Sequence, residues 1–338
     1  MSVPPGFSFG RLNRQPSPNA VVPIERATQH NYIISELCAK PGATINFSIP
    51  KSAVDPIRAV YKAGAETRTD KQHAIQSLRS AVQICKISVE RRLDRKLTDL
   101  GTEINILRTL PPHPNIVALL AEDDALDLGR LWLTMPVYSS RTLQHVLNAT
   151  ASVAPGMPSL PAGLAWSICA QAADIYLFLH HGVDINGVKD VNWGYVTHND
   201  GHTDNFLFKP CTPAGVPGKF NYPTLVLIDF GQADCRPNNC GLFDRRAIQR
   251  QQGRELTFLA EHLHALGSRA DKALHHWSGH LYGAGAEGVL PQKRFEILNK
   301  LAQKAKARVA AAGQPLDQDT AIWFEAAKVS DQDLERLL

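Results

Sequence analysis

Apolar residues recur along this chain in two patterns, one typical of helices and one typical of buried strands. The run 164–181, LAWSICAQAADIYLFLHH, is apolar almost all round, which predicts a long helix buried in the core. Between 97 and 110, Leu100, Ile104 and Leu107 recur at helical spacing and predict a second helix. Short apolar runs such as 131–135 (LWLTM) predict buried strands.

The remaining chain contains weaker patterns. We expect a strand at 43–49 and allow for a helix at 30–40. We also expect a polar helix at 69–81 and a short helix at 139–147, and the pattern of 267–338 is mainly helical. Residues 1–25 are rich in Pro, Ser, Gly and Asn, which predicts a flexible arm.

The richest candidate chemistry lies between residues 197 and 231. This stretch reads THNDGHTDNFLF and later TLVLIDFG, so that Asn205 follows Asp200 by five residues and Asp229 ends an apolar run. Asp229 and Asn205 carry hard oxygen donors of the kind that Mg²⁺ prefers. Phosphoryl transfer needs the charge of the moving group to be neutralised and its acceptor to be aligned, and these residue types suit that task. As separate residues they would be ordinary turn formers.

The pattern H-x-D-x-x-x-x-N followed by a strand and Asp-Phe-Gly resembles the catalytic and metal-binding loops of the protein-kinase superfamily. The resemblance covers about residues 55 to 266. It implies an α+β, two-lobed protein-kinase-like fold, with a small antiparallel-sheet N-lobe (26–136), a mainly helical C-lobe (137–338) and ATP with Mg²⁺ between them. It also implies that Asp200 orients an acceptor hydroxyl and takes its proton, and that Asn205 and Asp229 hold the metal.

Five further residues take their expected roles from the same resemblance. The run 81–87, AVQICKI, resembles the third strand of the kinase N-lobe, so Lys86 would contact the nucleotide phosphates and Glu103 would hold its amine. Met135 would sit behind the adenine, which the backbone of Val137 and Tyr138 would bind.

The segment 60–63, VYKA, resembles the second strand of that lobe. Counting back from it puts the three loop glycines of the family at Ala53, Asp55 and Arg58, none of which is glycine. A phosphate-binding loop needs glycine because its backbone N–H groups must approach the phosphates closely. We expect the Arg58 side chain to supply a phosphate contact in their place.

The catalytic loop departs from that of protein kinases. Asn199 replaces an arginine, and His202 stands where those kinases carry a lysine; aminoglycoside and choline kinases often carry histidine there. The segment after Asp229 is short and lacks Ala-Pro-Glu. The sequence predicts an atypical protein kinase that phosphorylates a hydroxyl. A small-molecule kinase and a pseudokinase scaffold remain the alternatives.

Composition narrows the class of protein. The 338 residues carry a formal charge of +4, which makes no case for a nucleic-acid partner. We predict no membrane partner and a cytoplasmic or nuclear location, because the N-terminus lacks the apolar core of a secretion signal. The six cysteines are scattered, so we expect neither disulfides nor zinc. The oligomeric state and the identity of the acceptor are left open.

Overall fold

The computed structural model describes residues 27–40, 42–63, 67–88, 99–122, 131–151, 160–313 and 315–338. The predicted flexible arm, residues 1–25, lies outside the described residues.

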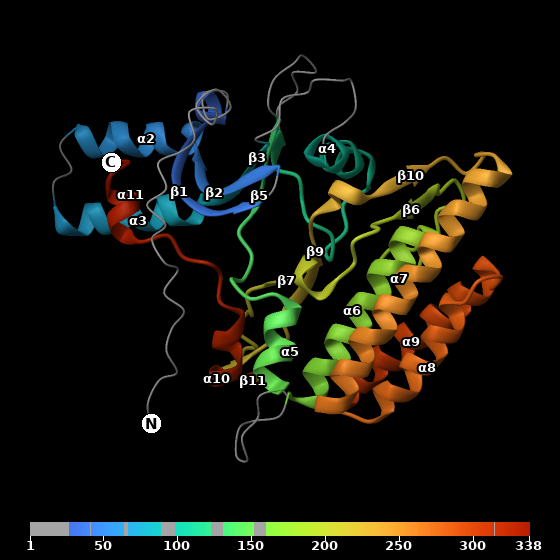
Figure 1. The fold of residues 1–338 in the computed structure, drawn as a ribbon. Helices are drawn as coiled ribbons and strands as arrows, with labels where there is room; N and C mark the ends of the chain where they lie inside the picture. The colour runs from blue at the N-terminus through green and yellow to red at the C-terminus, as the bar shows by residue number, and fades with distance from the viewer. Residues whose placement is uncertain are drawn as a thin grey trace.

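A five-stranded antiparallel sheet forms one end of the molecule (Figure 1). Its strands, in spatial order, are β1 (Asn31–Lys40), β2 (Ala43–Pro50), β3 (Gln83–Ser88), β5 (Trp132–Pro136) and β4 (Ala121–Glu122). The strands predicted at 43–49, 81–87 and 131–135 are therefore confirmed. With the helices below, the sheet makes the fold α+β, as expected.

The helix allowed for at 30–40 is wrong, because this run forms β1. The pairing of β1 with β2 shifts register between Ile33 and Ser35 and again between Glu36 and Cys38. Such shifts break the strict alternation of inward and outward residues by which a strand is recognised in a sequence.

The strand expected at 60–63 is also wrong. Two helices, α2 (Lys51–Lys62) and α3 (Arg68–Ser80), connect β2 to β3. In α2, Val54 is buried and Ile57 packs against the core one turn later, whereas Val60 is 69% exposed. Spacing of three to four residues is the signature of an amphipathic helix, and the four-residue match to a strand was too short to outweigh it. The polar helix predicted at 69–81 is confirmed as α3.

A long buried helix organises the other end of the molecule. This helix, α6 (Ala162–His181), matches the predicted helix at 164–181. It is preceded by α5 (Leu143–Ala151), which begins four residues later than the short helix predicted at 139–147. In the described part of the chain, α6 is the one helix long and apolar enough to cross a membrane, but 83% of its apolar window is buried inside the protein. It ends at Gly182, whose φ of +65° is a left-handed conformation that glycine adopts without strain.

Two short strand pairs bring the candidate loops together. Strand β7 (Phe206–Lys209) pairs with β9 (Thr224–Leu227), and β6 (Tyr195–Thr197) pairs with β10 (Asp234–Arg236). Because the pairs are antiparallel, the chain between β6 and β7 lies beside the chain between β9 and β10. A further short strand, β8 (Lys219–Phe220), pairs with β11 (Leu316–Asp317).

Helices α7 (Leu242–Arg269) and α9 (Pro291–Ala312) pack beside α6, and α8 (Ala273–Gly285) packs against α7 and α9 (Figure 1). Helices α7 and α8 approach so closely that a Cβ on Gly253 would lie 2.6 Å from the carbonyl oxygen of Gly285, which excludes any side chain there. The basic stretch of the sequence, KLAQKAKAR, lies in α9.

The end of the chain returns to the sheet. After α10 (Gln318–Ala321), the last helix, α11 (Asp331–Glu335), packs against α3 and β1, and Figure 1 shows the C-terminus beside α2. Leu334 of α11 is fully buried. Residues from the far end of the sequence thus pack against the edge strand β1 and the inserted helix α3.

Candidate functional site

Lys86 lies at the centre of a buried charge cluster. It stands in the middle of β3, opposite Ile45 on β2 and Leu133 on β5. Its Nζ lies 2.7 Å from Oε2 of Glu103 on α4 (Asp99–Thr109) and 2.7 Å from Oδ1 of Asp229. The predicted contact between Lys86 and Glu103 is confirmed. The third partner comes from a loop more than 140 positions away in the sequence.

The electrostatics of this cluster favour a charged lysine. Burial by itself would lower the pKa of Lys86, but the negative charges of Glu103 and Asp229 outweigh burial and raise it. Complete burial raises the pKa of Glu103, an effect that Lys86 opposes. A buried ion pair of this kind is costly to break, because removing one partner leaves the other charge uncompensated.

Helix α4 holds Glu103 where Lys86 can reach it. Leu100, Ile104 and Leu107 are buried on the helix as predicted, and Glu103 is fully buried beside them. The helix packs against a short 3-10 turn, Phe230–Gln232, that follows Asp229. Gly231 sits tightly there, since a Cβ would lie 3.1 Å from the Cβ of Asp99. Helix and turn therefore position Glu103 and Asp229 together.

Asp229 has an unusual backbone conformation. Its φ of 65° and ψ of 64° lie in the left-handed region, which non-glycine residues seldom occupy. The preceding residue, Ile228, donates its backbone N–H to the carbonyl of Asn205 and accepts a hydrogen bond from Nε2 of His198. These two bonds tie the Asp229 segment to the 198–205 loop.

Within that loop, the polar side chains converge on Asp200. Nδ2 of Asn205 donates to the Asp200 carbonyl at 2.8 Å and to its carboxylate at 3.0 Å. Nε2 of His202 lies 3.5 Å from the same carboxylate, and the His202 and Asp200 side chains are 48% and 40% exposed. The structure therefore groups the partly exposed side chains of Asp200 and His202 with the buried Asn205, and links them to Asp229 through Ile228.

The buried carboxylate of Glu255 on α7 holds the backbone of this loop, a contact that the sequence alone did not predict. Its Oε1 accepts the backbone N–H groups of His198 and Asn199 at 2.5 and 2.6 Å, and its Oε2 lies 2.5 Å from Nε2 of His180. Asn199 itself has a φ of 63°. Glu255 lies within α7, 56 residues from Asn199, so the local sequence pattern carries no signal for this backbone contact.

The predicted adenine contacts, which lie at the end of β5 and just after it, differ in their surroundings. Met135 is buried and pairs with Ile84, so it shares a sheet face with Lys86. The carbonyl of Tyr138 accepts the N–H of Ala327. Val137 lines a cavity of about 450 Å³ together with residues 326–329. Of the predicted adenine contacts, Met135 thus lies on the expected face, and Val137 faces the C-terminal segment.

Arg58 does not lie at this site. The prediction rested on a second strand at 60–63, and that segment is helix α2. The Arg58 guanidinium donates to the carbonyl of Leu337 at 2.7 Å and to the hydroxyl of Tyr32 at 3.0 Å. The turn that joins the first two strands instead contains Gly42, with a φ of 83°, and the adjoining Ala43 pairs with Ser88 on the lysine strand. The misplaced strand hid this turn from sequence reasoning.

The donor set at the site fits a magnesium ion. Asp229 and Asn205 offer carboxylate and amide oxygens, and Mg²⁺ is commonly held by one or two protein oxygens with water and substrate phosphate completing its shell. Among the residues that the structure describes, no three His, Cys, Asp or Glu side chains converge as a denser metal site would require. A metal here would therefore depend on its phosphate ligand.

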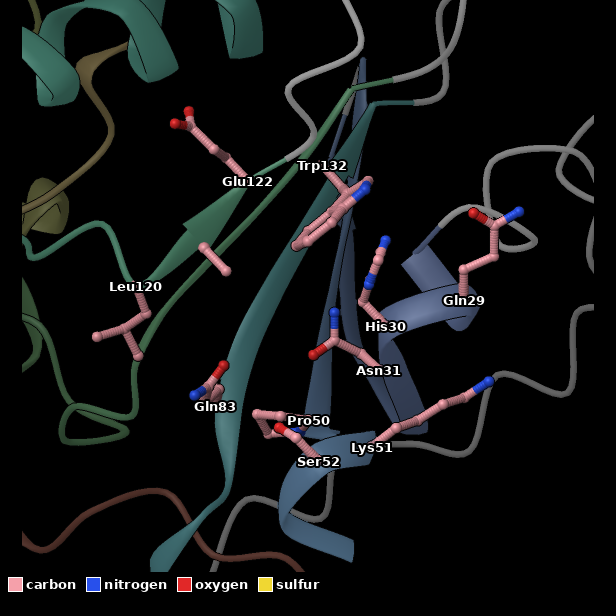
Figure 2. Close-up of a pocket in the computed structure, with 11 residues that line it drawn as sticks. Gln29, His30, Asn31, Pro50, Lys51, Ser52, Gln83, Leu120, Glu122 and Trp132 are labelled. Atoms are coloured by element: carbon pink, nitrogen blue, oxygen red, sulfur yellow. The ribbon is translucent and has the colours of Figure 1, made fainter. Parts of the chain in front are cut away.

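The opposite face of the sheet carries a separate cavity of about 550 Å³. Gln83 and Trp132 line it, and they alternate along β3 and β5 with the residues that face Glu103. Figure 2 shows the Asn31 amide among these side chains, with the Glu122 carboxylate turned away from them. That carboxylate accepts a hydrogen bond from Arg108. This cavity is therefore distinct from the Lys86 cluster.

Comparison with models of known protein families gave no match to this chain, and comparison with curated proteins gave none.

Proposed function

We propose that this protein is a two-lobed, kinase-like phosphotransferase that uses ATP and Mg²⁺ to phosphorylate a hydroxyl group. The sheet with α4 would form the N-lobe and the region from α5 onward the C-lobe. The observation that supports this most is the cluster of Lys86, Glu103 and Asp229, in which a strand lysine bridges a helix glutamate and the aspartate of Asp-Phe-Gly. Protein kinases require this lysine–glutamate pair and this aspartate together.

The chemistry assigned to each residue follows from its position. Bound Mg²⁺ would neutralise charge on the triphosphate, with Asp229 and Asn205 as its protein ligands. Lys86 would contact the phosphates, and Asp200 would accept the proton of the attacking hydroxyl as its oxygen bonds to the γ-phosphorus and the bond to the β-phosphate oxygen breaks. The exposed Asp200 carboxylate suits a group that must meet an acceptor from solution.

The acceptor is proposed to be a protein, so that the chain would be an atypical protein kinase. A small-molecule acceptor is the second candidate, because His202 approaches the Asp200 carboxylate within 3.5 Å in a loop that resembles those of aminoglycoside and choline kinases. A pseudokinase scaffold is the third, and it has no need of all of Lys86, Glu103, Asp200, Asn205 and Asp229.

Two variants test the proposal. In the wild-type protein, Mg²⁺-ATP at 100 times its dissociation constant should stabilise the fold by about 2.7 kcal/mol. Asp229→Asn should lose most of this stabilisation, whereas Asp200→Asn should keep it and lose phosphoryl transfer. Thermal unfolding with and without Mg²⁺-ATP measures binding, and radiolabelled ATP offered to protein and metabolite mixtures measures transfer. Unchanged Mg²⁺-ATP binding in Asp229→Asn would count against the metal assignment, and full turnover in Asp200→Asn would remove Asp200 as the base.

A further inference from the structure

Four of the thirteen histidines in the chain gather where α7 turns into α8. His264 lies near the end of α7, and His275, His276 and His280 lie on the first two turns of α8. His264, His276 and His280 are exposed, and His275 is half-buried. None of these residues belongs to the Lys86 cluster.

The four side chains form two close pairs. The Nδ1 atoms of His264 and His275 lie 3.1 Å apart, with the rings at 83° to each other. The Nε2 atoms of His276 and His280, which are four residues apart on one helix, lie 3.0 Å apart with the rings at 89°. The first pair bridges two helices, and the second lies within one.

Helix packing produces the bridging pair. A Cβ on Gly267 of α7 would lie 2.9 Å from the backbone nitrogen of His275 and 3.0 Å from its ring. The missing side chain at 267 therefore lets the start of α8 lie directly on α7, which brings His275 beside His264. The second pair forms within one helix and does not depend on helix packing, because residues at i and i+4 are neighbours on a helix surface.

In each pair the two ring nitrogens are separated by the distance expected for two ligands on one metal ion. Imidazole nitrogens bind transition metals at about 2.0–2.1 Å, so two of them on one ion lie about 2.9–3.4 Å apart for bond angles between square and tetrahedral. The observed separations of 3.0 and 3.1 Å fall in that range. A hydrogen bond between two neutral rings gives the same separation, and this is the competing explanation.

We propose that this end of the α7–α8 hairpin binds divalent transition-metal ions through two bis-histidine sites, one bridging His264 and His275 and one formed by His276 and His280. Imidazole ligands select Cu²⁺, Ni²⁺ and Zn²⁺ rather than Mg²⁺, with Cu²⁺ bound most strongly. No third His, Cys, Asp or Glu joins either pair among the described residues, so water or an external ligand completes each shell. Such sites hold a labile, exchangeable ion.

Trp277 provides a reporter for the second site. Its ring lies 5.5 Å from that of His280 and 6.4 Å from that of His276. Cu²⁺ bound to this pair should quench the Trp277 fluorescence in a saturable way, and Trp277→Phe should remove most of that quenching. Zn²⁺ and Ni²⁺ binding is followed by calorimetry in metal-free buffer.

The matched variants are His276→Gln with His280→Gln, His264→Gln with His275→Gln, and a control that changes the exposed His73 and His145. Each paired variant should lose one equivalent of bound Cu²⁺ or weaken its binding at least tenfold, and the control should bind as wild type does. Circular dichroism and the metal-free Tm of each variant establish that it is folded. The proposal would be overturned if the wild-type protein bound none of the three ions at 100 µM, or if the paired variants bound Cu²⁺ like the control. The two histidine pairs would then be explained as hydrogen-bonded rings.

Discussion

At the scale of single residues, one buried carboxylate determines the shape of the candidate catalytic loop. Glu255 is almost fully buried and uses both oxygens, one for two backbone N–H groups of the loop and one for His180. The left-handed backbone at Asn199 is held by these contacts and by a bond from the Asn199 side chain to the carbonyl of Gln232. Backbone strain persists at a site only where the surroundings fix it in this way.

We therefore expect Glu255→Leu to destabilise the protein by about 3 kcal/mol, because it leaves buried N–H groups without partners. Glu255→Gln, which retains an accepting oxygen, should cost less. The matched control is Glu261→Leu, an exposed position on the same helix, which should change stability by no more than about 0.5 kcal/mol. Urea unfolding measures all three, and equal stability of Glu255→Leu and Glu261→Leu would contradict the anchoring role.

At the scale of elements, the C-terminal segment holds the sheet and its inserted helices. Arg79 of α3 pairs with Asp331, Lys71 pairs with Glu335 at 3.0 Å, and Arg58 of α2 binds the Leu337 carbonyl. The same segment binds the Tyr138 carbonyl through Ala327. One stretch of chain thus contacts α2, α3 and the end of β5.

The burial of Leu334 should contribute more to this attachment than the surface ion pairs. We expect Leu334→Ala to destabilise the protein by about 2–3 kcal/mol, because it removes a fully buried side chain and leaves a cavity. Glu335→Ala on the same helix breaks an ion pair whose side chains are 41% and 39% exposed, and should cost less than about 1 kcal/mol. Thermal unfolding compares the two, and hydrogen exchange in α3 reports local release. Equal effects would show that α11 docks through its charges.

At the scale of the whole molecule, buried histidines make stability depend on pH. Burial lowers the pKa of His113 and of His262 to about 4, and that of His181 to about 3, from an ordinary value of 6.5. Neighbouring cations and histidines add to the effect, although Asp184 opposes it at His113. At these three positions the unfolded chain therefore binds more protons than the folded protein between about pH 6.5 and pH 4.

Because the unfolded state binds more protons in that window, stability should fall as the pH falls from 6.5 to 4. The measurement is Tm against pH. Replacing His262 with Gln should flatten the dependence, whatever it does to the absolute Tm, and replacing the exposed His73 should leave it unchanged. A Tm that stays constant from pH 6.5 to 4 would be inconsistent with buried neutral histidines.

The parts of the fold that were predicted correctly share a physical feature. The lysine strand, the helix that carries Glu103 and the long buried helix α6 all have strong local periodicity or apolar runs, and these form the same element in most contexts. The segments 30–40 and 60–63 were predicted wrongly, because register shifts interrupt the alternating pattern of β1 and because the amphipathic pattern of α2 is weak over a short window. Arg58 was misassigned to the site for that reason, and the turn at Gly42 was missed.

The sequence by itself determined which side chains could do chemistry and on which elements most of them lie, because residue type and local periodicity are carried by neighbouring positions. Only the tertiary structure decided that Asp229 joins Lys86 and Glu103, that Glu255 holds the 198–205 loop, and that the C-terminal helix α11 packs against α3 and β1. These contacts join residues far apart in the chain, and they form only when burial of the shared core brings the elements together.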